Sequence, residues 1–232
     1  TAWPPTSAGH SLGEFSALVA AGALSFEDGL KLVYARAMAM QKACEAQPST
    51  MAAIIALPDE KVEEICAQVS AEGEVCVAAN YNCPGQIVIS GKTEAVAEAG
   101  EKLKEAGAKR VLPLKVSGPF HSKMLVGAGE KLGKVLDTVE IHTPEIPYIA
   151  NVTADYVTDA ADVKPLLMKQ VSSSVRWEQT IRKMLADGVD TFIEIGPGKT
   201  LTGFMRKIDK NAKAFNIEKL EDIDKVKEAL GC

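Results

Sequence analysis

Gly9-His10-Ser11-Leu12-Gly13 is the stretch that decides the fold of this chain of 232 residues. A G-x-S-x-G run is typical of a sharp turn from a strand into a helix, with the serine hydroxyl exposed at the helix N-terminus. Gly9 and Gly13 fit this turn because small flanking residues let the backbone fold tightly. Such a short pattern also arises by chance, so the surrounding sequence decides between a reactive serine and an ordinary turn.

The sequence after this turn predicts two helices. Residues 14–22 form a short apolar run that ends at a glycine. Ser25 and Asp28 predict the N-terminal cap of a longer helix. Its stripe at spacings of three and four consists of Leu30, Val33, Tyr34, Ala37, Met38 and Gln41. Spacing alone favours a solvated role for Arg36 at the edge of this stripe; the alternative is a guanidinium that binds a substrate carboxylate.

A second stretch, Ser117-Gly118-Pro119-Phe120-His121-Ser122, supplies a candidate base. A serine hydroxyl is a weak nucleophile at neutral pH, so acyl chemistry needs a base within hydrogen-bond reach and donors for the oxyanion. His121 is the candidate base for Ser11. The N–H of Leu12, at the start of the helix, is a candidate oxyanion donor.

The middle of the chain predicts a separate subdomain at residues 49–117. Its pattern indicates the order βαββαβ, which is that of a ferredoxin-like unit. The predicted strands are 51–57, 75–79, 86–90 and 110–116, and the predicted helices are 59–70 and 94–107. Residues 1–48 and 118–232 predict an α/β core of the hydrolase-like parallel-sheet type, into which the subdomain is inserted. The active site is then expected in the cleft between the two domains.

The composition restricts the function classes. Hydrophobic residues make up 47% of the chain and charged residues 25%, which allows a sizeable core. No apolar run reaches the length of a membrane span and no secretory signal is recognisable, so we expect no membrane partner and a cytoplasmic location. The net charge of −5 argues against nucleic acid as a partner, because phosphate binding needs clustered positive charge.

No metal or nucleotide site is expected. The five cysteines contain no C-x-x-C pair, and the three histidines lack partners at ligand spacing. The run Gly196-Pro197-Gly198-Lys199-Thr200 ends like a phosphate-binding P-loop, but Ile193 stands where the first glycine is needed. A turn after a buried strand at residues 191–195, with Glu194 in a structural role, is the better interpretation.

Taken together, these motifs resemble the malonyl-CoA:acyl carrier protein transacylases and the related acyltransferase domains of fatty acid and polyketide synthases. The resemblance covers nearly all of the chain. It is carried by GHSLGEFSALVAAGALS, the arginine of YARAMAMQ, NYNCPGQIVISG, SGPFHS and TFIEIGPGKTLTGF, in the order of the family.

The resemblance implies a role for individual residues. Ser11 is the acylated nucleophile, and His121 is the base that later protonates the leaving thiolate. Arg36 holds the malonyl carboxylate. The main-chain carbonyl of Gln170 orients His121, in place of the aspartate of a full triad. Asn82 lies in a loop that resembles the rim of the active site and is a binding candidate.

The resemblance also implies a substrate and partners. Leu12 and Phe120 agree with members that prefer malonyl groups, since a phenylalanine beside the acyl pocket fills the volume of an α-methyl branch; one methyl group is worth about 1 to 3 kcal/mol. The expected reaction moves a malonyl group from malonyl-CoA to the phosphopantetheine thiol of acyl carrier protein. No bound cofactor and a monomeric full-length enzyme are expected.

One departure concerns the N-terminus, where the family has about eighty further residues with a Gly-Gln-Gly motif that helps to complete the oxyanion hole. Only eight residues, Thr1-Ala2-Trp3-Pro4-Pro5-Thr6-Ser7-Ala8, stand before Gly9 in this sequence, and they do not contain that motif. We therefore expect a fragment that lacks one oxyanion donor.

Two alternatives remain. A serine esterase or thioesterase shares the nucleophile and the base but needs an acidic third residue, such as Asp187 or Asp190. Hydrolases of that class place the histidine after the acid, whereas His121 precedes both. A non-catalytic fragment that docks on the carrier protein is the second alternative.

Overall fold

A computed structural model describes residues 5–71, 73, 75–116 and 118–231. Ser117 of the second motif lies outside the described residues, as do residues 1–4, 72, 74 and 232. The described residues form two compact units, one within Pro4–Thr180 and the other within Ile181–Cys232. Each unit is described by itself.

The first unit begins with the predicted turn from strand to helix. Strand β1 (Ser7–Ala8) leads into helix α1 (Gly13–Ala20). β1 pairs in parallel with β6 (Tyr148–Ile149), and β6 pairs antiparallel with β7 (Tyr156–Val157). The residues that follow β6 therefore lie beside the turn that carries Ser11.

Helix α2 (Phe26–Cys44) begins where the sequence predicts. The Ser25 hydroxyl accepts a hydrogen bond of 3.0 Å from the N–H of Asp28, which confirms the predicted cap. The stripe at spacings of three and four, which would be buried in an amphipathic helix, is largely exposed. Leu30, Tyr34 and Met38 are 61%, 68% and 52% exposed, respectively. The buried face consists of Gly29, Leu32, Arg36, Ala39 and Met40.

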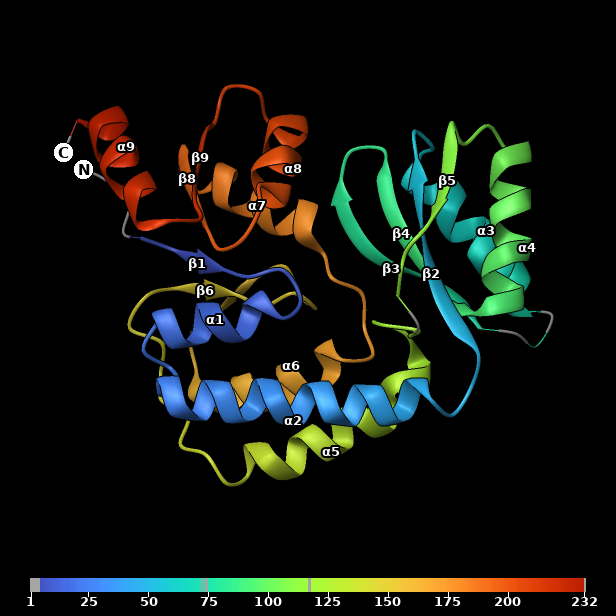
Figure 1. The fold of residues 1–232 in the computed structure, drawn as a ribbon, viewed down its shortest axis with the longest axis horizontal. Coiled ribbons are helices and arrows are strands. Elements are labelled where there is room, and N and C mark those ends of the chain that lie inside the picture. The colour runs from blue at the N-terminus through green and yellow to red at the C-terminus, as the bar shows by residue number, and fades with distance from the viewer. Residues whose placement is uncertain (1–4, 72, 74, 117, 232) are drawn as a thin grey trace. The chain divides into compact units, whose positions relative to one another are not determined.

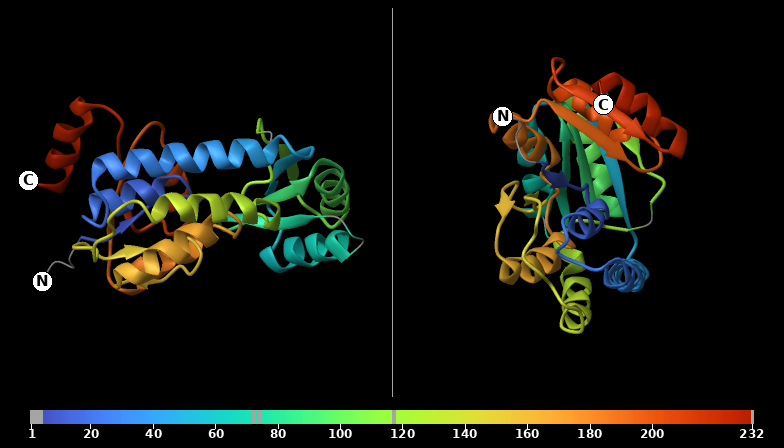
Figure 2. Two further views of the ribbon diagram at one scale, coloured as in Figure 1. Left: turned by 90° about the horizontal axis from the view of Figure 1, so that it is seen from below. Right: turned by 90° about the vertical axis from the view of Figure 1, so that its left-hand side faces the viewer.

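Helices α1, α2, α5 (Val126–Leu136) and α6 (Ala160–Gln170) and strand β6 all contribute to the main apolar core of this unit. α2 packs against α5, and α5 packs against α6, as Figure 1 and Figure 2 show. A short 3-10 turn, η1 (Lys123–Leu125), precedes α5. The fully buried members of this core include Phe15, Leu18, Leu32, Leu132, Tyr148 and Leu167. The core thus fixes α1 and β6, the two elements next to Ser11.

The middle of the chain forms a four-stranded antiparallel sheet with the predicted order of elements. These are β2 (Ser49–Ile55), α3 (Asp59–Ala71), β3 (Cys76–Cys83), β4 (Gln86–Lys92), α4 (Thr93–Glu105) and β5 (Arg110–Pro113). The strand order is β3-β4-β2-β5, and α3 and α4 cover one face (Figure 1). β3 extends beyond the predicted strand, and β5 ends before Val116.

A short segment continues the sheet at the β3 edge. The N–H of Tyr81 donates to Val175 O at 2.9 Å, and the N–H of Val175 donates to Ala79 O at 2.8 Å. The Ser174 hydroxyl donates to Ala78 O at 2.6 Å. These bonds satisfy backbone groups that an open edge would leave unpaired, and they tie β3 to the segment that follows α6.

The second unit contains a parallel pair of strands. The boundary between the units falls within α7 (Trp177–Ala186). β8 (Thr191–Ile195) pairs with β9 (Lys213–Ile217), and the helices are α8 (Thr200–Ile208) and α9 (Leu220–Leu230). The Glu194 carboxylate accepts hydrogen bonds from the N–H groups of Leu201 and Thr202 at the start of α8. These bonds agree with a structural role for Glu194. The prediction of a buried strand was wrong, since Ile193 and Ile195 are 42% and 80% exposed.

The chain therefore has a mixed α/β fold. The division into a core of residues 1–48 and 118–232 and a subdomain of residues 49–117 stays a prediction. None of the helices in the described part of the chain combines the length and apolar character that a membrane span requires.

Candidate active site

The structure brings Ser11 and His121 together. Ser11 Oγ lies 2.7 Å from His121 Nε2, although 110 residues separate them in the sequence. Both residues have a positive φ, 53° for Ser11 and 59° for His121. Residues other than glycine rarely adopt this conformation, and such strain is concentrated at functional sites.

The other ring nitrogen of His121 faces main-chain oxygens. His121 Nδ1 lies 2.9 Å from Gln170 O and 3.2 Å from Ser173 O. Because carbonyl oxygens only accept, Nδ1 carries the proton, and Nε2 is left to accept the hydrogen of the Ser11 hydroxyl. Burial lowers the pKa of His121 to about 4, with a smaller contribution of the same sign from the charge of Arg36. The imidazole is therefore neutral, as a base must be.

The turn itself depends more on one glycine than on the other. A Cβ at Gly9 would lie 1.8 Å from Gly13 O, so no other residue fits without a backbone shift. A Cβ at Gly13 would meet no atom within 4 Å outside its own helix.

The N–H of Leu12 lies at the start of α1, where helical N–H groups lack partners within the helix. The Leu12 side chain is 49% exposed.

Arg36 is buried, so the solvated role that its spacing favours is wrong. Its Nη2 donates to Ser11 Oγ at 3.1 Å and to Gln170 Oε1 at 3.2 Å. Its Nε is buried without a hydrogen-bond partner among the described residues. Burial lowers the pKa of Arg36 to about 10, against the opposing effect of the Glu14 charge. The guanidinium is therefore a cation next to the nucleophile, and its Nε donor is uncommitted.

Sequence reasoning missed two residues of the hydrogen-bond network around Ser11, Asn151 and Glu14. The Asn151 side chain accepts from the N–H of Ser11 and donates to Gly9 O, both at 2.7 Å. The Glu14 carboxylate accepts from Gln170 Nε2 at 2.9 Å and from the N–H of Asn151 at 3.1 Å. Burial raises the pKa of Glu14 to about 7. A carboxylate inside an apolar helix was the available signal for Glu14; for Asn151 the sequence held none.

Asn82 lies on strand β3 and not in a loop, which corrects the expectation. Its side chain is buried, and its Oδ1 lies 2.9 Å from His10 Nε2. The imidazole of His10 also lies against Trp177, with 5.6 Å between the ring centres. Burial lowers the pKa of His10. Asn82 thus connects the four-stranded sheet to the turn that carries Ser11.

Phe120 immediately precedes His121 and is half-buried between two apolar clusters. A Cβ at Gly118 would lie 2.8 Å from its ring and 2.4 Å from Cys44 Sγ. Tight packing at Gly118 therefore restricts where the aromatic ring lies.

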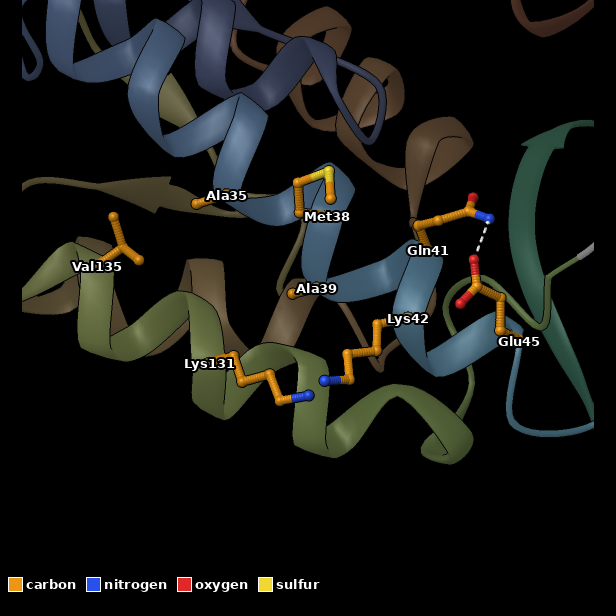
Figure 3. Close-up of a pocket in the computed structure, with 8 residues that line it drawn as sticks. All are labelled: Ala35, Met38, Ala39, Gln41, Lys42, Glu45, Lys131 and Val135. Atoms are coloured by element: carbon orange, nitrogen blue, oxygen red, sulfur yellow. Dashed lines mark hydrogen bonds between the residues drawn. The ribbon is translucent and has the colours of Figure 1, made fainter.

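A surface groove of about 520 Å³ between α2 and α5 contains none of the predicted site residues (Figure 3). Ala35, Met38, Ala39 and Val135 form its apolar part. The side chains of Lys42 and Lys131 point toward each other at its edge, as Figure 3 shows. In the part of the chain that the structure describes, no three histidine, cysteine, aspartate or glutamate side chains are grouped as metal ligands.

Comparisons with known proteins agree on one family. Residues 3–224 match the family model described as the acyl transferase domain. The malonyl CoA-acyl carrier protein transacylase of Bacillus subtilis is 48% identical over 221 residues, which are 95% of this chain and 70% of that relative.

Solved structures of similar proteins superpose closely. An acyl carrier protein S-malonyltransferase from Vibrio cholerae has a TM-score of 0.93 at 44% identity, covering 97% of this chain and 73% of that one. A malonyl-transacylase in complex with a type II PKS acyl-carrier protein has a TM-score of 0.94 at 38% identity, covering 98% of this chain and 74% of that one.

Proposed function

The chain belongs to the acyl transferase domain family, and on this basis we propose that it transfers a malonyl group from malonyl-CoA to the phosphopantetheine thiol of an acyl carrier protein. The observation that carries the proposal is the 2.7 Å distance between Ser11 Oγ and His121 Nε2. The choice of malonyl as the acyl group and of acyl carrier protein as the acceptor rests on the similar proteins, which are named for this transfer.

The first half-reaction makes an acyl-enzyme. His121 Nε2 takes the proton of the Ser11 hydroxyl while Oγ attacks the thioester carbonyl of malonyl-CoA. The N–H of Leu12 donates to the oxyanion of the tetrahedral intermediate. The carbon–sulfur bond then breaks, and CoA leaves as a thiol with the proton that His121 returns. Ser11 is left as a malonyl ester.

The second half-reaction reverses these steps with a different thiol. His121 takes the proton of the phosphopantetheine thiol, and the sulfur attacks the malonyl ester of Ser11. The Ser11–acyl bond breaks, Oγ recovers the proton from His121, and the malonyl group leaves on the carrier protein. Ping-pong kinetics are the consequence.

Arg36 selects a substrate with a free carboxylate. Its guanidinium is buried, cationic and bonded to Ser11 Oγ, and its Nε has no hydrogen-bond partner among the described residues. A planar guanidinium binds a carboxylate through two parallel hydrogen bonds, which lysine cannot do. Malonyl-CoA gains this interaction, whereas acetyl-CoA does not.

The remaining site residues have supporting roles in this proposal. The main-chain oxygen of Gln170 orients His121, as the 2.9 Å contact with Nδ1 supports. Phe120 and Leu12 favour malonyl over methylmalonyl groups in the acyl pocket. Asn82 contributes to substrate binding through its contact with His10, the residue before Ser11.

The proposal extends to the architecture and the setting of the enzyme. The four-stranded unit is of the ferredoxin-like type, which its strand order supports, and the surrounding core is of the hydrolase-like type. The enzyme works as a monomer in the cytoplasm, without a bound cofactor, and serves fatty acid or polyketide synthesis.

The geometry disfavours both alternatives. An esterase with a full triad needs a carboxylate at His121 Nδ1, but two main-chain oxygens already lie at that nitrogen. A non-catalytic docking fragment would not need a serine aligned with a neutral histidine, yet the structure contains this pair.

The test is intact-mass spectrometry after brief incubation with malonyl-CoA, acetyl-CoA or methylmalonyl-CoA. We expect a malonyl adduct on the wild-type protein, little adduct with the other two thioesters, and none on the Ser11→Ala variant. Addition of carrier protein should discharge the adduct. An adduct that persists in Ser11→Ala, or one that water removes as fast as the carrier protein does, would refute the transacylase.

A further inference from the structure

We propose that Glu14 is a positioning residue that holds the main chain of Ser11 in its reactive conformation through Asn151 and Gln170. The inference rests on the proposed role of Ser11 as the nucleophile. All three residues are fully buried, and they come from α1, from the residues after β6 and from the end of α6.

Both main-chain groups of Ser11 are held by side-chain amides. The N–H of Ser11 donates to Asn151 Oδ1 at 2.7 Å, and its carbonyl oxygen accepts from Gln170 Nε2 at 2.7 Å. Ser11 has a φ of 53°, a left-handed conformation that costs an L-residue free energy. Two hydrogen bonds on the strained peptide groups offset this cost and fix the direction of Oγ.

One carboxylate oxygen anchors both holders. Glu14 Oε2 accepts from the N–H of Asn151 at 3.1 Å and from Gln170 Nε2 at 2.9 Å. Its other oxygen, Oε1, lies 3.5 Å from the Tyr148 hydroxyl. Hydrogen bonds to an ionised carboxylate are about twice as strong as those between neutral groups. Glu14 thus connects Asn151, after β6, and Gln170, at the end of α6, to helix α1, which begins beside Ser11.

Glu14 also sets which way the Gln170 amide points. Ser11 O and Glu14 Oε2 are both acceptors, so the amide nitrogen must face them. The amide oxygen then faces Arg36, whose Nη2 donates to it at 3.2 Å and to Ser11 Oγ at 3.1 Å. The same residue, Gln170, holds His121 through its main chain. Glu14 therefore acts on the nucleophile and on the base without touching either side chain.

A purely structural role predicts something different. If Glu14 only stabilised the fold, its replacement would lower stability and leave the reactivity of the folded protein unchanged. If it only balanced the charge of Arg36, its replacement would change the KM for malonyl-CoA. A positioning residue changes kcat at nearly constant KM, because it acts on the geometry of attack.

The experiment compares Glu14→Gln, Glu14→Met and the exposed control Glu130→Gln with the wild-type protein. Glu14→Gln keeps the shape with a neutral acceptor, and Glu14→Met removes both acceptors. Two rates are measured by intact mass: malonylation from malonyl-CoA and sulfonylation by phenylmethylsulfonyl fluoride. The second reagent needs only an aligned serine. It therefore tests the positioning role even if the protein does not use malonyl-CoA.

We expect both rates to fall about tenfold in Glu14→Gln and about a hundredfold or more in Glu14→Met, as one to two weakened charge-assisted hydrogen bonds imply. The KM should change less than about threefold, and Glu130→Gln should match the wild type. Sulfonylation at the wild-type rate in Glu14→Met, or a loss that lies in KM alone, overturns the inference. If Glu14→Met does not fold, Glu14→Gln decides alone, and a wild-type rate overturns the inference.

A separate outcome concerns the proposed function. A wild-type protein that is sulfonylated at Ser11 but never malonylated refutes the transacylase, while the sulfonylation rates of the variants still decide the role of Glu14.

Discussion

Ser11 Oγ lies 2.7 Å from His121 Nε2, and both residues have left-handed backbone conformations. The two side chains meet because each backbone turns sharply at the reactive residue. Among the described residues only Ala56 and Ala154 share this property without being glycine. The strain is thus placed where it directs a nucleophile toward its base.

Replacement of His121 by alanine should lower the rate of malonyl-Ser11 formation by about 10² to 10⁴, the range for loss of a general base. The KM for malonyl-CoA should change little, because His121 does not bind the carboxylate in the proposed mechanism. Rapid-quench intact-mass measurements give both values. A variant that forms the ester at the wild-type rate would exclude His121 as the base.

The dependence of kcat/KM on pH should show two steps. Burial lowers the pKa of His121 to about 4, so the base is neutral and active above that pH. Burial raises the pKa of Glu14 to about 7, so its carboxylate gains its charge near neutrality. We expect a partial fall of about tenfold as pH drops through 7, and a complete loss only toward pH 4. The upper step should be absent in Glu14→Gln. A single step near the ordinary histidine pKa of 6.5 would contradict this assignment.

The sequence predicted the parts of the fold that depend on neighbouring residues. The G-x-S-x-G run located the turn before α1, and Ser25 located the start of α2. The order of strands and helices in the middle of the chain followed from periodicity alone. Ser11 and His121 were candidates from their residue types, but only the resemblance paired them, since no local pattern relates Ser11 to a histidine 110 residues away.

Contacts between distant segments could not be predicted in this way. Asn151 holds the turn from 140 residues away, and the short strand β6 that precedes it has no distinctive pattern. The buried face of α2 was misassigned because the helix is apolar on more than one side, and periodicity identifies a helix but not its neighbours. The burial of Arg36 was missed for the same reason, because Arg36 lies on the face of α2 that is buried in the structure.

The two glycines of the motif provide a matched pair of variants. Gly9→Ala should destabilise the protein by about 3 kcal/mol or more, because its Cβ would lie 1.8 Å from Gly13 O. Gly13→Ala should stay within about 1 kcal/mol of wild type, because its Cβ meets no atom within 4 Å outside its helix. Chemical denaturation measures the free energy of unfolding of each variant, and the sulfonylation rate of Ser11 measures the geometry of the turn. Equal effects in the two variants would contradict the described turn.

Arg36→Lys should reduce malonylation by about 10- to 100-fold, the loss expected for a charge-assisted hydrogen bond to a carboxylate. Acetylation from acetyl-CoA should change much less, so the ratio of the two rates falls. Competition between the two thioesters, read by intact mass, gives this ratio directly. Arg206→Lys, an exposed arginine on α8, is the control. A ratio that stays constant would assign the recognition of malonyl groups to another residue.

Glu14→Gln should stabilise the protein at pH 8 while it slows the reaction. The pKa of Glu14 rises from an ordinary value of 4.5 to about 7 on folding, so the folded state binds more protons between these pH values. The stability contributed by the protonated form is therefore complete below about pH 4.5 and is lost as pH rises through 7. Glutamine cannot ionise and avoids this loss, which amounts to about 3 kcal/mol for such a shift.

Thermal unfolding of the wild type and of Glu14→Gln from pH 5 to pH 8 measures this difference. The two proteins should unfold at similar temperatures at pH 5, and the variant should unfold at a higher temperature at pH 8. The lowered pKa of His121 has the opposite effect, since the unfolded chain binds more protons between pH 4 and 6.5. That contribution is common to both proteins and cancels in the difference. A variant that is less stable at pH 8 would mean that Glu14 serves the fold; a more stable but slower variant means that its buried charge is retained for reactivity.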